Sequence, residues 1–329
     1  NRALASQGLK VMSNWGNPGL KALLDVAGSK GPAGVFHAGF ILGPRINAGG
    51  RVGRSDLGAR LLSTDDPEEA RDIAAQLDLL NVERKEVEKQ VLDEAIERIE
   101  HETNLDPDAP VILVSGDGWH PGVIGIVAGR LRERYRKPVM VIGIDRPANV
   151  GKGSGRSQTG YNLGRAVQGA YEAGLLLSGG GHAMAAGLSV RPELIPELRA
   201  FLEEKLSHER EEAEAADLFD IDALVSAGGA GRALYDDFQR LTPFGPGNPE
   251  PVFAAAGLRV DQSSSLKGGH VRCTLTDERG GKLRAVAWRA GDTEIGKTLL
   301  QRGALVHVAG RLKADDWNGR NGVELEIDD

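Results

Sequence analysis

The stretch Ser178-Gly179-Gly180-Gly181-His182-Ala183-Met184-Ala185-Ala186-Gly187 places three consecutive glycines directly before a histidine. Glycine has no Cβ, so a ligand can lie close against the backbone N–H groups of a loop built from it. His182 adds one titratable hydrogen-bonding group beside them. The pattern predicts a phosphate cradle formed by Gly179, Gly180 and Gly181 with His182. A flexible turn with an incidental histidine is the alternative.

A second glycine-rich loop, Gly151-Lys152-Gly153-Ser154-Gly155-Arg156-Ser157, lies shortly before the first and carries two cations. Hydroxyl groups and a guanidinium between glycines are suited to holding a phosphate through side-chain and backbone N–H contacts. The stretch therefore predicts a second anion cradle beside the first. This hypothesis requires the two stretches to lie close together beside an open channel.

A third stretch, Gly43-Pro44-Arg45-Ile46-Asn47-Ala48-Gly49-Gly50-Arg51-Val52-Gly53-Arg54, alternates small residues with arginine and asparagine. It predicts an anion-binding loop in which Arg45, Arg51 and Arg54 contact the ligand and Asn47 fixes the backbone. The alternative is a glycine-rich connector whose arginines cap helix carbonyl groups.

Composition is that of an ordinary water-soluble chain of two or three domains: 329 residues, 40% hydrophobic and 26% charged. The net charge of −7 argues against a nucleic-acid partner, but acidic residues crowd into 65–102 and 203–222 while the glycine-rich stretches are cationic. No apolar run reaches the ~20 residues of a membrane span. Cys273 is the one cysteine, which fits a reducing cytoplasm. The first residue is not Met, which suggests that the chain is a piece of a longer protein.

The first half reads as helices followed by an α/β arrangement. Asn17 before Pro18 is a good helix start, and residues 63–107 read as one long connector helix with solvated charges. The apolar runs 111–114 and 138–142 flank a helical segment and predict a βαβ unit. His120 and Trp119 then lie at the carboxyl end of a strand, where ligands bind in such folds. Capping of the following helix is an equally supported role for His120.

The last third has a different texture, with a linker at 209–217 and short alternating strands from about 258 onward. Five such strands separated by turn residues predict a small closed barrel of the OB type. Arg272, Arg284 and Trp288 alternate with buried positions and could line a strand face for base stacking and phosphate contact. Ordinary solvent-facing side chains are the alternative.

These motifs carry a family resemblance over essentially the whole chain. The chain resembles the RecJ single-strand-specific 5′→3′ DNA exonucleases of the DHH/DHHA1 phosphoesterase group. The matching segments, in family order, are 42–53 (LGPRINAGGRVG), 118–128 (GWHPGVIGIVA), 153–157 (GSGRS), 179–187 (GGGHAMAAG) and 243–253 (PFGPGNPEPVF).

The resemblance implies an α/β chain in four parts. Residues 1–62 resemble the end of a DHH catalytic domain, 63–107 the connector helix, 108–208 the DHHA1 domain, and 209–329 a linker and OB-fold domain. The family hydrolyses phosphodiester bonds with Mg²⁺ or Mn²⁺, whose ligands include an Asp-His-His motif. That motif does not occur in this sequence, so we assign no metal ligand here and expect the metals to be bound by an amino-terminal part.

The resemblance also suggests roles for the residues singled out above. His182 and Arg45 are candidate catalytic residues. The candidate DNA-phosphate ligands are Arg51, Asn47, Ser154, Arg156, Ser157, Gly179, Gly180, Gly181 and His120. The implied partner is single-stranded DNA, with a single-strand-binding protein and a helicase as further candidates and no membrane. Two alternatives stay open: a nucleic-acid-binding module without catalysis, and a DHH/DHHA1 oligoribonuclease or nucleotide phosphatase.

Overall fold

The computed structural model describes residues 1–101, 109–209, 219–315 and 322–329. The chain divides into two compact units: one comprises Leu9–Leu218, and the other comprises Asn1–Gly8 with Phe219–Asp329. Helix α1 (Arg2–Met12) runs across the boundary between the two. Each unit is described by itself.

Residues 9–101 of the larger unit are helical. They form α2 (Pro18–Val26), a π-helical segment η1 (His37–Leu42), α3 (Gly43–Val52), α4 (Leu57–Ser63) and the 35-residue α5 (Pro67–His101). Asn17 caps α2 as expected, since its Oδ1 accepts a hydrogen bond from the Leu20 N–H at 2.9 Å. Leu23, Leu57, Leu61 and Leu77 are almost fully buried together, so α2, α4 and the first half of α5 share one core.

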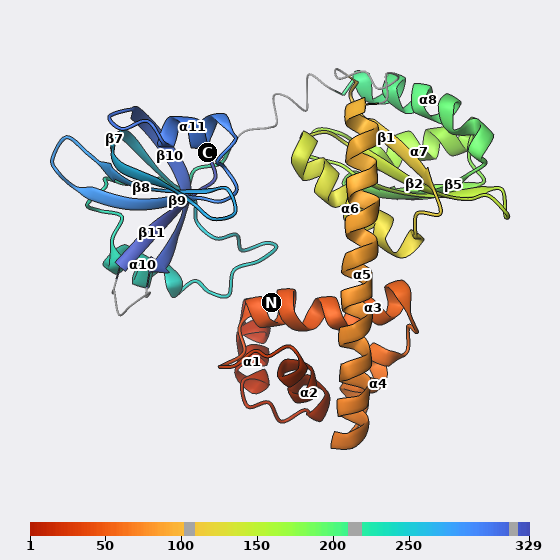
Figure 1. The fold of residues 1–329 in the computed structure, drawn as a ribbon, viewed down its shortest axis with the longest axis horizontal. Helices are drawn as coiled ribbons and strands as arrows, with labels where there is room; N and C mark the ends of the chain where they lie inside the picture. The colour runs from red at the N-terminus through yellow and green to blue at the C-terminus, as the bar shows by residue number, and fades with distance from the viewer. Residues whose placement is uncertain (102–108, 210–218, 316–321) are drawn as a thin grey trace. The chain divides into compact units, whose positions relative to one another are not determined.

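The expected long helix is therefore confirmed as α5, and it serves two cores. Its first half packs in the helical core, while Val91 and Ala95 of its second half pack against α6 (Pro121–Tyr135) and the adjoining sheet (Figure 1). Only a narrow stripe of the helix is covered, which agrees with the polar residues on most of its circumference.

A five-stranded sheet forms the rest of the larger unit, in the order β1-β2-β3-β5-β4. Its strands are β1 (Ile112–Asp117), β2 (Val139–Asp145), β3 (Val150–Arg156), β4 (Ser178–His182) and β5 (Ala185–Val190). The expected βαβ unit is confirmed, because β1 and β2 are parallel with α6 between them; the remaining pairs are antiparallel.

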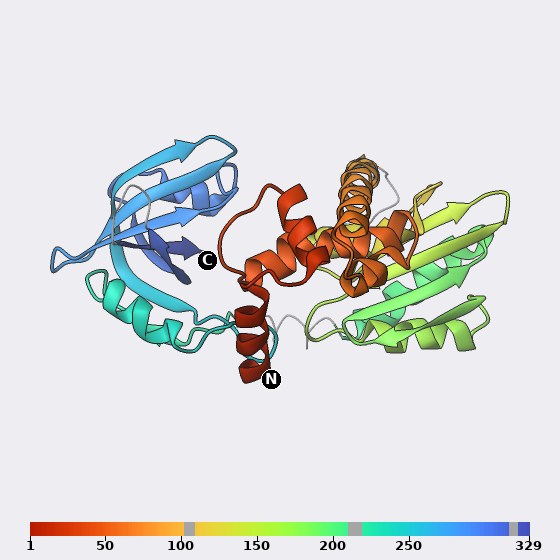
Figure 2. The same ribbon diagram turned by 90° about the horizontal axis from the view of Figure 1, so that it is seen from below.

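Helices cover the two faces of this sheet unequally. α7 (Leu163–Glu172) and α8 (Ile195–Ser207), which follows the short 3₁₀ turn η2 (Pro192–Leu194), pack on one face with Met140, Leu188 and Val190. α5 and α6 pack on the other face against Val114, Val139 and Val141 of β1 and β2. Figure 2 shows the sheet with α5 and the green helices on opposite sides. On the α6 side, β5 and β4 contribute no residue to the core.

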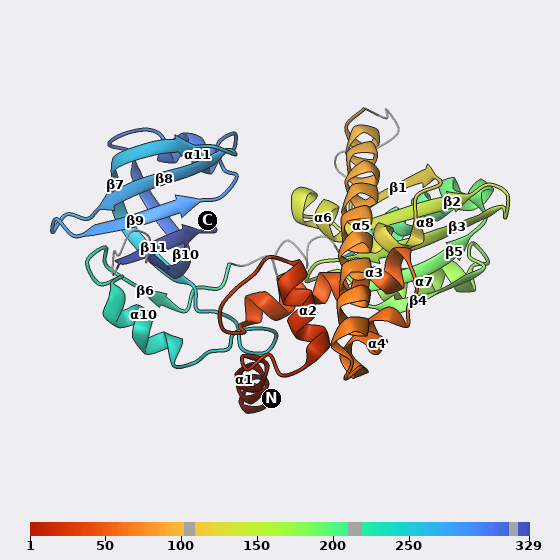
Figure 3. The same ribbon diagram turned by 60° about the horizontal axis from the view of Figure 1, so that its bottom comes forward.

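The smaller unit is a barrel (Figure 3). It contains the strands β6 (Ala223–Leu224), β7 (Phe253–Leu266), β8 (His270–Thr276), β9 (Lys282–Ala287), β10 (Leu305–Asp315) and β11 (Gly322–Ile327), and the helices α10 (Arg232–Gln239) and α11 (Glu294–Leu299). Pairing of β10 with β7 closes the circuit β7-β8-β9-β11-β10, in which β9 and β11 are parallel. Five strands closed in this way, with a helix between the third and fourth, confirm the expected OB-type barrel. The expected linker at 209–217 lies, from residue 210, outside the described residues.

Candidate nucleic-acid interface

The two glycine-rich stretches lie in the same sheet, on β3 and β4, with β5 between them. Cross-strand register aligns Ser154 with Gly187 and Gly180, and Arg156 with Ala185 and His182. Residues paired across a ladder point to the same face, so each row presents its side chains together. The two stretches therefore share one surface, which we call the open face: the α6-side face of β3, β5 and β4.

Both stretches are strands, so the prediction of two glycine-rich loops is wrong. Val150–Arg156 is β3 itself and Ser178–His182 is the edge strand β4, joined to β5 by a tight turn at residues 183–184. Glycine is scarce in strands, and a run of it reads locally as a loop. Here it lets neighbouring groups approach the backbone: a Cβ on Gly153 or Gly155 would lie 2.6 Å from Leu188 or Leu163 on the α7 face.

The three glycines before His182 do not act alike. A Cβ on Gly179 would lie 2.9 Å from Leu176 and Val167 in the α7 core, and one on Gly181 would lie 2.3 Å from the Ala185 carbonyl oxygen. Gly180 has nothing within 4 Å of its Cβ position, and Gly187 of β5 meets only the Gly153 oxygen at 3.8 Å. Bare backbone on the open face therefore comes from Gly180 and Gly187, and Gly187 was not among the predicted ligands.

Arg156 and Ser154 are positioned on the open face beside α6. The Arg156 Nη1 donates to the Ser154 Oγ at 3.2 Å and to the Gly155 carbonyl oxygen at 2.8 Å. Gly125 of α6 leaves room for them, since a Cβ there would lie 2.9 Å from the Ser154 Oγ and 3.2 Å from the Arg156 Nη2. Ser157 differs: it is 2% exposed, its Oγ hydrogen-bonds the Gln158 carbonyl oxygen, and it contributes to packing.

His182 lies at the exposed end of β4. Its Nδ1 accepts a hydrogen bond from the Met184 N–H at 3.3 Å, which directs the ring over the turn into β5. This leaves Nε2 as the atom that can contact a ligand. His182 and Arg156 thus flank the open face from β4 and β3.

The Arg45–Arg51 stretch is helix α3, so the expected loop is wrong here too. Arg45 is held by Asp78 of α5 through Nε at 2.7 Å and by the Ile41 carbonyl oxygen at 2.8 Å, with 16% of its side chain exposed. Asn47 is exposed one turn before Arg51, on the same side of the helix, and does not brace a loop. Arg54 pairs with Asp56.

Arg51 connects α3 to the start of α6. Its Nη1 donates to the Gly122 carbonyl oxygen at 3.0 Å, and a Cβ on Gly122 would lie 2.1 Å from the Arg51 carbonyl oxygen. Arg51 is also close enough to Arg156 for its positive charge, after burial, to lower the pKa of Arg156. Arg51 and Arg156 are both arginines, so they form one positive site where α6 begins.

His120 is the N-cap of α6, because its Nδ1 accepts from the Gly122 N–H at 3.0 Å. The capping role is thus shown, and the ring is exposed at the amino terminus of α6. Trp119 does not reach the ligand side. It is 4% exposed, and its Nε1 donates to the Glu94 Oε2 at 2.8 Å, so that part of the prediction is wrong.

Sequence reasoning missed a buried ionic group on α5 next to this site. Glu88 is 1% exposed and pairs with Arg84 of its own helix and Arg130 of α6. The charge pattern alone indicates a solvated face at these positions, which is wrong. Helical spacing could have revealed this group. The buried stripe of α5 contains Leu77, Val91 and Ala95, and Asn81, Arg84 and Glu88 lie on the same stripe. Polar residues are unusual on a buried stripe.

The barrel has its own candidate face on β8 and β9. Arg272 pairs with Glu324 of β11 at 2.9 Å, and Arg284 pairs with Asp315 and Glu324. These partners neutralise part of the expected positive face. Trp288 is 50% exposed and packs edge-on against His270 at 4.8 Å, which leaves one face of its indole for stacking.

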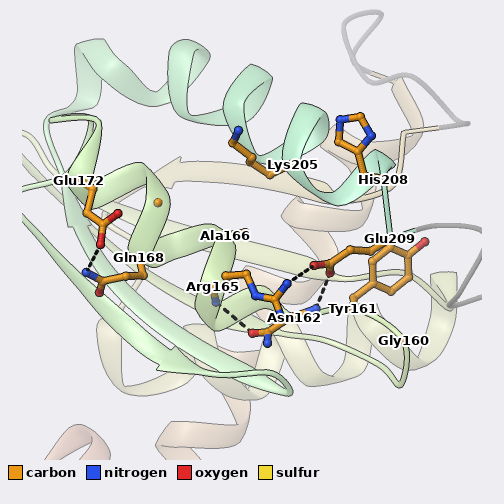
Figure 4. A pocket seen from close by; sticks show the side chains of 11 residues that line it. Gly160, Tyr161, Asn162, Arg165, Ala166, Gln168, Glu172, Lys205, His208 and Glu209 are labelled. Atoms are coloured by element: carbon orange, nitrogen blue, oxygen red, sulfur yellow. Dashed lines mark hydrogen bonds and ion pairs between the residues drawn. The ribbon is translucent and has the colours of Figure 1, made fainter.

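A pocket of about 790 Å³ opens elsewhere, between α7 and the end of α8 (Figure 4). Glu209 closes one side, accepting a hydrogen bond from the Asn162 N–H at 2.6 Å. The pocket is lined by the basic residues Arg165, Lys205 and His208 and by the acidic residues Glu172 and Glu209. The pocket lies on the α7 side of the sheet and not on the open face.

The residues that the structure describes contain neither a metal centre nor a membrane span. No group of three or more His, Cys, Asp or Glu side chains among them is arranged to hold a metal ion, so these residues do not fit a metal centre. No helix in this part of the chain combines the length and apolarity needed to cross a bilayer.

Comparison with known proteins covers both units. The DHHA1 domain profile matches residues 108–208 and the RecJ OB domain profile matches residues 221–329. The single-stranded-DNA-specific exonuclease RecJ of Bacillus subtilis is 32% identical over 332 residues, spanning 100% of this chain and 41% of the relative. The enzyme of the same name from Thermus thermophilus is 31% identical, spanning 100% of this chain and 45% of its own length.

Solved structures agree with the sequence relatives. Crystal structures of RecJ from Thermus thermophilus in complex with Mn²⁺ and with Mg²⁺ each superpose with a TM-score of 0.80 at 30% identity. They match 100% of this chain and 46% and 48% of the respective crystal chains. The chain thus spans about half the length of the proteins it matches.

Proposed function

Since the chain belongs to the RecJ family, we propose that its open face binds the sugar–phosphate backbone of single-stranded DNA and so supplies the substrate-binding part of a single-strand-specific 5′→3′ exonuclease. The observation that carries the proposal is the joint position of Arg51 and Arg156 at the start of α6, beside the bare backbone of Gly180 and Gly187.

The proposed contacts recognise phosphate and not base. Arg51 and Arg156 bind phosphate oxygens through charge-assisted hydrogen bonds, and the amino terminus of α6 adds its partial positive charge. Such contacts carry no base information, which suits an enzyme that digests any sequence. His182 acts from the opposite edge of the open face as a hydrogen-bond donor to a phosphate near the reacting bond.

Arg45 is not among the proposed catalytic residues, because its guanidinium donates hydrogen bonds to Asp78 and to the Ile41 carbonyl oxygen. Ser157 and Gly179 likewise face the packed interior. The proposed ligands are therefore Arg51, Ser154, Arg156, Gly180, Gly187 and His182, with His120 and Asn47 at the margin.

Divalent-metal chemistry belongs to this proposal only as the family's cofactor requirement. The described residues do not fit a metal centre. In the barrel, we propose that Trp288 stacks on a base of single-stranded DNA. Arg272 and Arg284 are not proposed as ligands, because Glu324 and Asp315 pair with them.

Binding of a labelled oligothymidylate to the 329-residue chain, measured by fluorescence anisotropy across a range of salt concentrations, tests the proposal. Arg156→Ala is expected to weaken binding about tenfold and to reduce the salt slope by about 0.7, the value for one lost phosphate contact on a single strand. Arg146→Ala is the control, since Arg146 pairs with Asp117 at the opposite end of β3. Equal affinity of wild type and Arg156→Ala would refute the proposal.

A further inference from the structure

Glu88 is a buried carboxylate bound by arginines from two helices. Its Oε2 accepts from the Arg84 Nη1 at 2.5 Å, and its Oε1 lies 2.5 Å from the Arg130 Nη2. Arg84 is itself buried and donates from Nη2 to the Asn81 Oδ1 at 3.1 Å. The Arg130 side chain, by contrast, is 56% exposed. The carboxylate therefore holds one buried and one solvent-facing guanidinium at the contact between α5 and α6.

The positive charge in this region exceeds what Glu88 can neutralise. Burial lowers the pKa of Arg84; the charge of Glu88 raises it, and the charges of Arg51 and Arg130 lower it. Arg51 acts in the same way on Arg156. The charge of Arg51 thus acts on both Arg84 and Arg156, while Glu88 pairs with Arg84 and Arg130. Like charges held together in a partly buried place are costly unless an anion joins them.

Two buried polar atoms in this group make no hydrogen bond within the described residues: the Arg84 Nε, and the Glu88 Oε1, which has only its ion pair with Arg130. A buried donor left in this state is uncommon.

Glycines on α6 let these arginines pack close to the helix. Gly122 lies against Arg51, Gly125 lies against Arg156, and Gly129 has open space around its Cβ position. These glycines recur at helical spacing, and Arg130 follows Gly129 directly. Arg51 and Arg156 therefore pack against the first turns of α6, and Arg130 lies further along the same helix.

We propose that Glu88 is a positioning residue, which orients Arg130 with Arg84 behind it so that a second phosphate of the same single strand binds along α6. The inference rests on the proposed function, because it extends the phosphate site at Arg51 and Arg156 by a further subsite. The ligand class is unchanged: the phosphodiester backbone of single-stranded nucleic acid.

The direction in which Glu88→Gln changes DNA affinity distinguishes a positioning role from an effect of net charge. Glu88→Gln keeps the shape of the side chain and removes its negative charge. If only total charge mattered, binding of a polyanion would tighten. If Glu88 holds Arg130 in place, binding weakens by about five- to tenfold, as for one lost charge-assisted contact, and the salt slope falls by about 0.7.

The experiment measures oligothymidylate affinity and its salt slope for the 329-residue chain. Glu100→Gln is the matched control, since Glu100 also pairs α5 with α6, through Arg134 at 2.8 Å, at an exposed position. Arg130→Gln should match the loss of Glu88→Gln, and the double variant should bind no more weakly than either single variant, because the two substitutions remove the same contact. Arg130→Lys should recover part of the affinity.

The possible outcomes decide between the two proposals. A folded Glu88→Gln that binds as tightly as wild type, or more tightly, overturns the positioning role. If Glu88→Gln does not fold, the exposed Arg130→Gln decides, and wild-type affinity and salt slope for that variant overturn the subsite. Arg156→Ala in the same assay reports on the proposed function separately: its loss of affinity with unchanged Glu88→Gln binding refutes the further inference alone.

Discussion

Arg156 of β3 and His182 of β4 stand in one cross-strand row, with Ala185 of β5 between them. Two strand spacings separate their backbones by roughly 10 Å. Both side chains lie on the open face, so a strand lying across this row meets a permanent cation at one edge and a titratable ring at the other.

The row leads to a prediction about His182. His182→Ala in the complete enzyme should lower kcat by about 10- to 100-fold while reducing oligonucleotide affinity less than Arg156→Ala does, because a donor near the reacting bond acts mainly in the transition state. Turnover of a single-stranded substrate, with affinity measured separately, tests this. Equal losses in kcat and affinity for the two variants would assign His182 to ground-state binding.

The open glycines yield a second prediction. Gly180→Val and Gly187→Val should leave folding intact, because their Cβ positions face open space, yet weaken oligonucleotide binding by covering the backbone. Affinity and melting temperature should be measured together.

Gly181→Val serves as the comparison, since its Cβ would lie 2.3 Å from the Ala185 carbonyl oxygen. It should lower the melting temperature instead. If all three variants bind DNA like the wild type, no ligand lies against this backbone.

The overall fold could be predicted where the pattern is periodic. Apolar spacing indicates α5, hydrophobic runs indicate β1 and β2, and alternation indicates the barrel strands. β3 and β4 could not be recognised in this way, because glycine hides the alternation of a strand, and β5, which pairs with β3 on one side, lies about thirty to forty residues further along the chain. What makes them strands is tertiary: α7 side chains and Leu188 fill the space left by the missing Cβ atoms.

The candidate site was predictable in its residue types and less so in their roles. Arg45, Arg51 and Arg156 look alike in the sequence, and only the fold shows that Asp78 occupies the first. Arg84 and Glu88 have the spacing of an ordinary solvated pair on a helix. They are buried because α6 packs over them, a contact that no local pattern encodes.

Arg45 gives the third prediction. Arg45→Met should lower the free energy of unfolding by about 1–3 kcal/mol, the scale for a partly buried, charge-assisted hydrogen bond, and leave oligonucleotide affinity unchanged. Chemical denaturation and anisotropy provide the two readouts.

The control is Arg54→Met, because the Arg54–Asp56 pair is exposed at both side chains. Its removal should change stability little. A large loss of DNA affinity in Arg45→Met with unaltered stability would restore Arg45 as a ligand.

Cys273 provides the last prediction, in the barrel. Burial, and then the charge of Glu324, raises the pKa of this thiol from 9.0 to about 12. Between these values the unfolded chain releases a proton that the folded chain keeps, so the thiol's contribution to stability is complete below pH 9 and is lost as the pH rises. The melting temperature of the wild type should therefore fall more steeply from pH 8 to pH 10.5 than that of Cys273→Ala, which lacks the titrating group.

The same burial should keep a thiol reagent from reacting with the folded chain at pH 8, with reaction beginning only as denaturant opens the barrel. Parallel melting profiles for the two proteins, or rapid labelling of the folded chain, would show that Cys273 is reached by water and ionises normally.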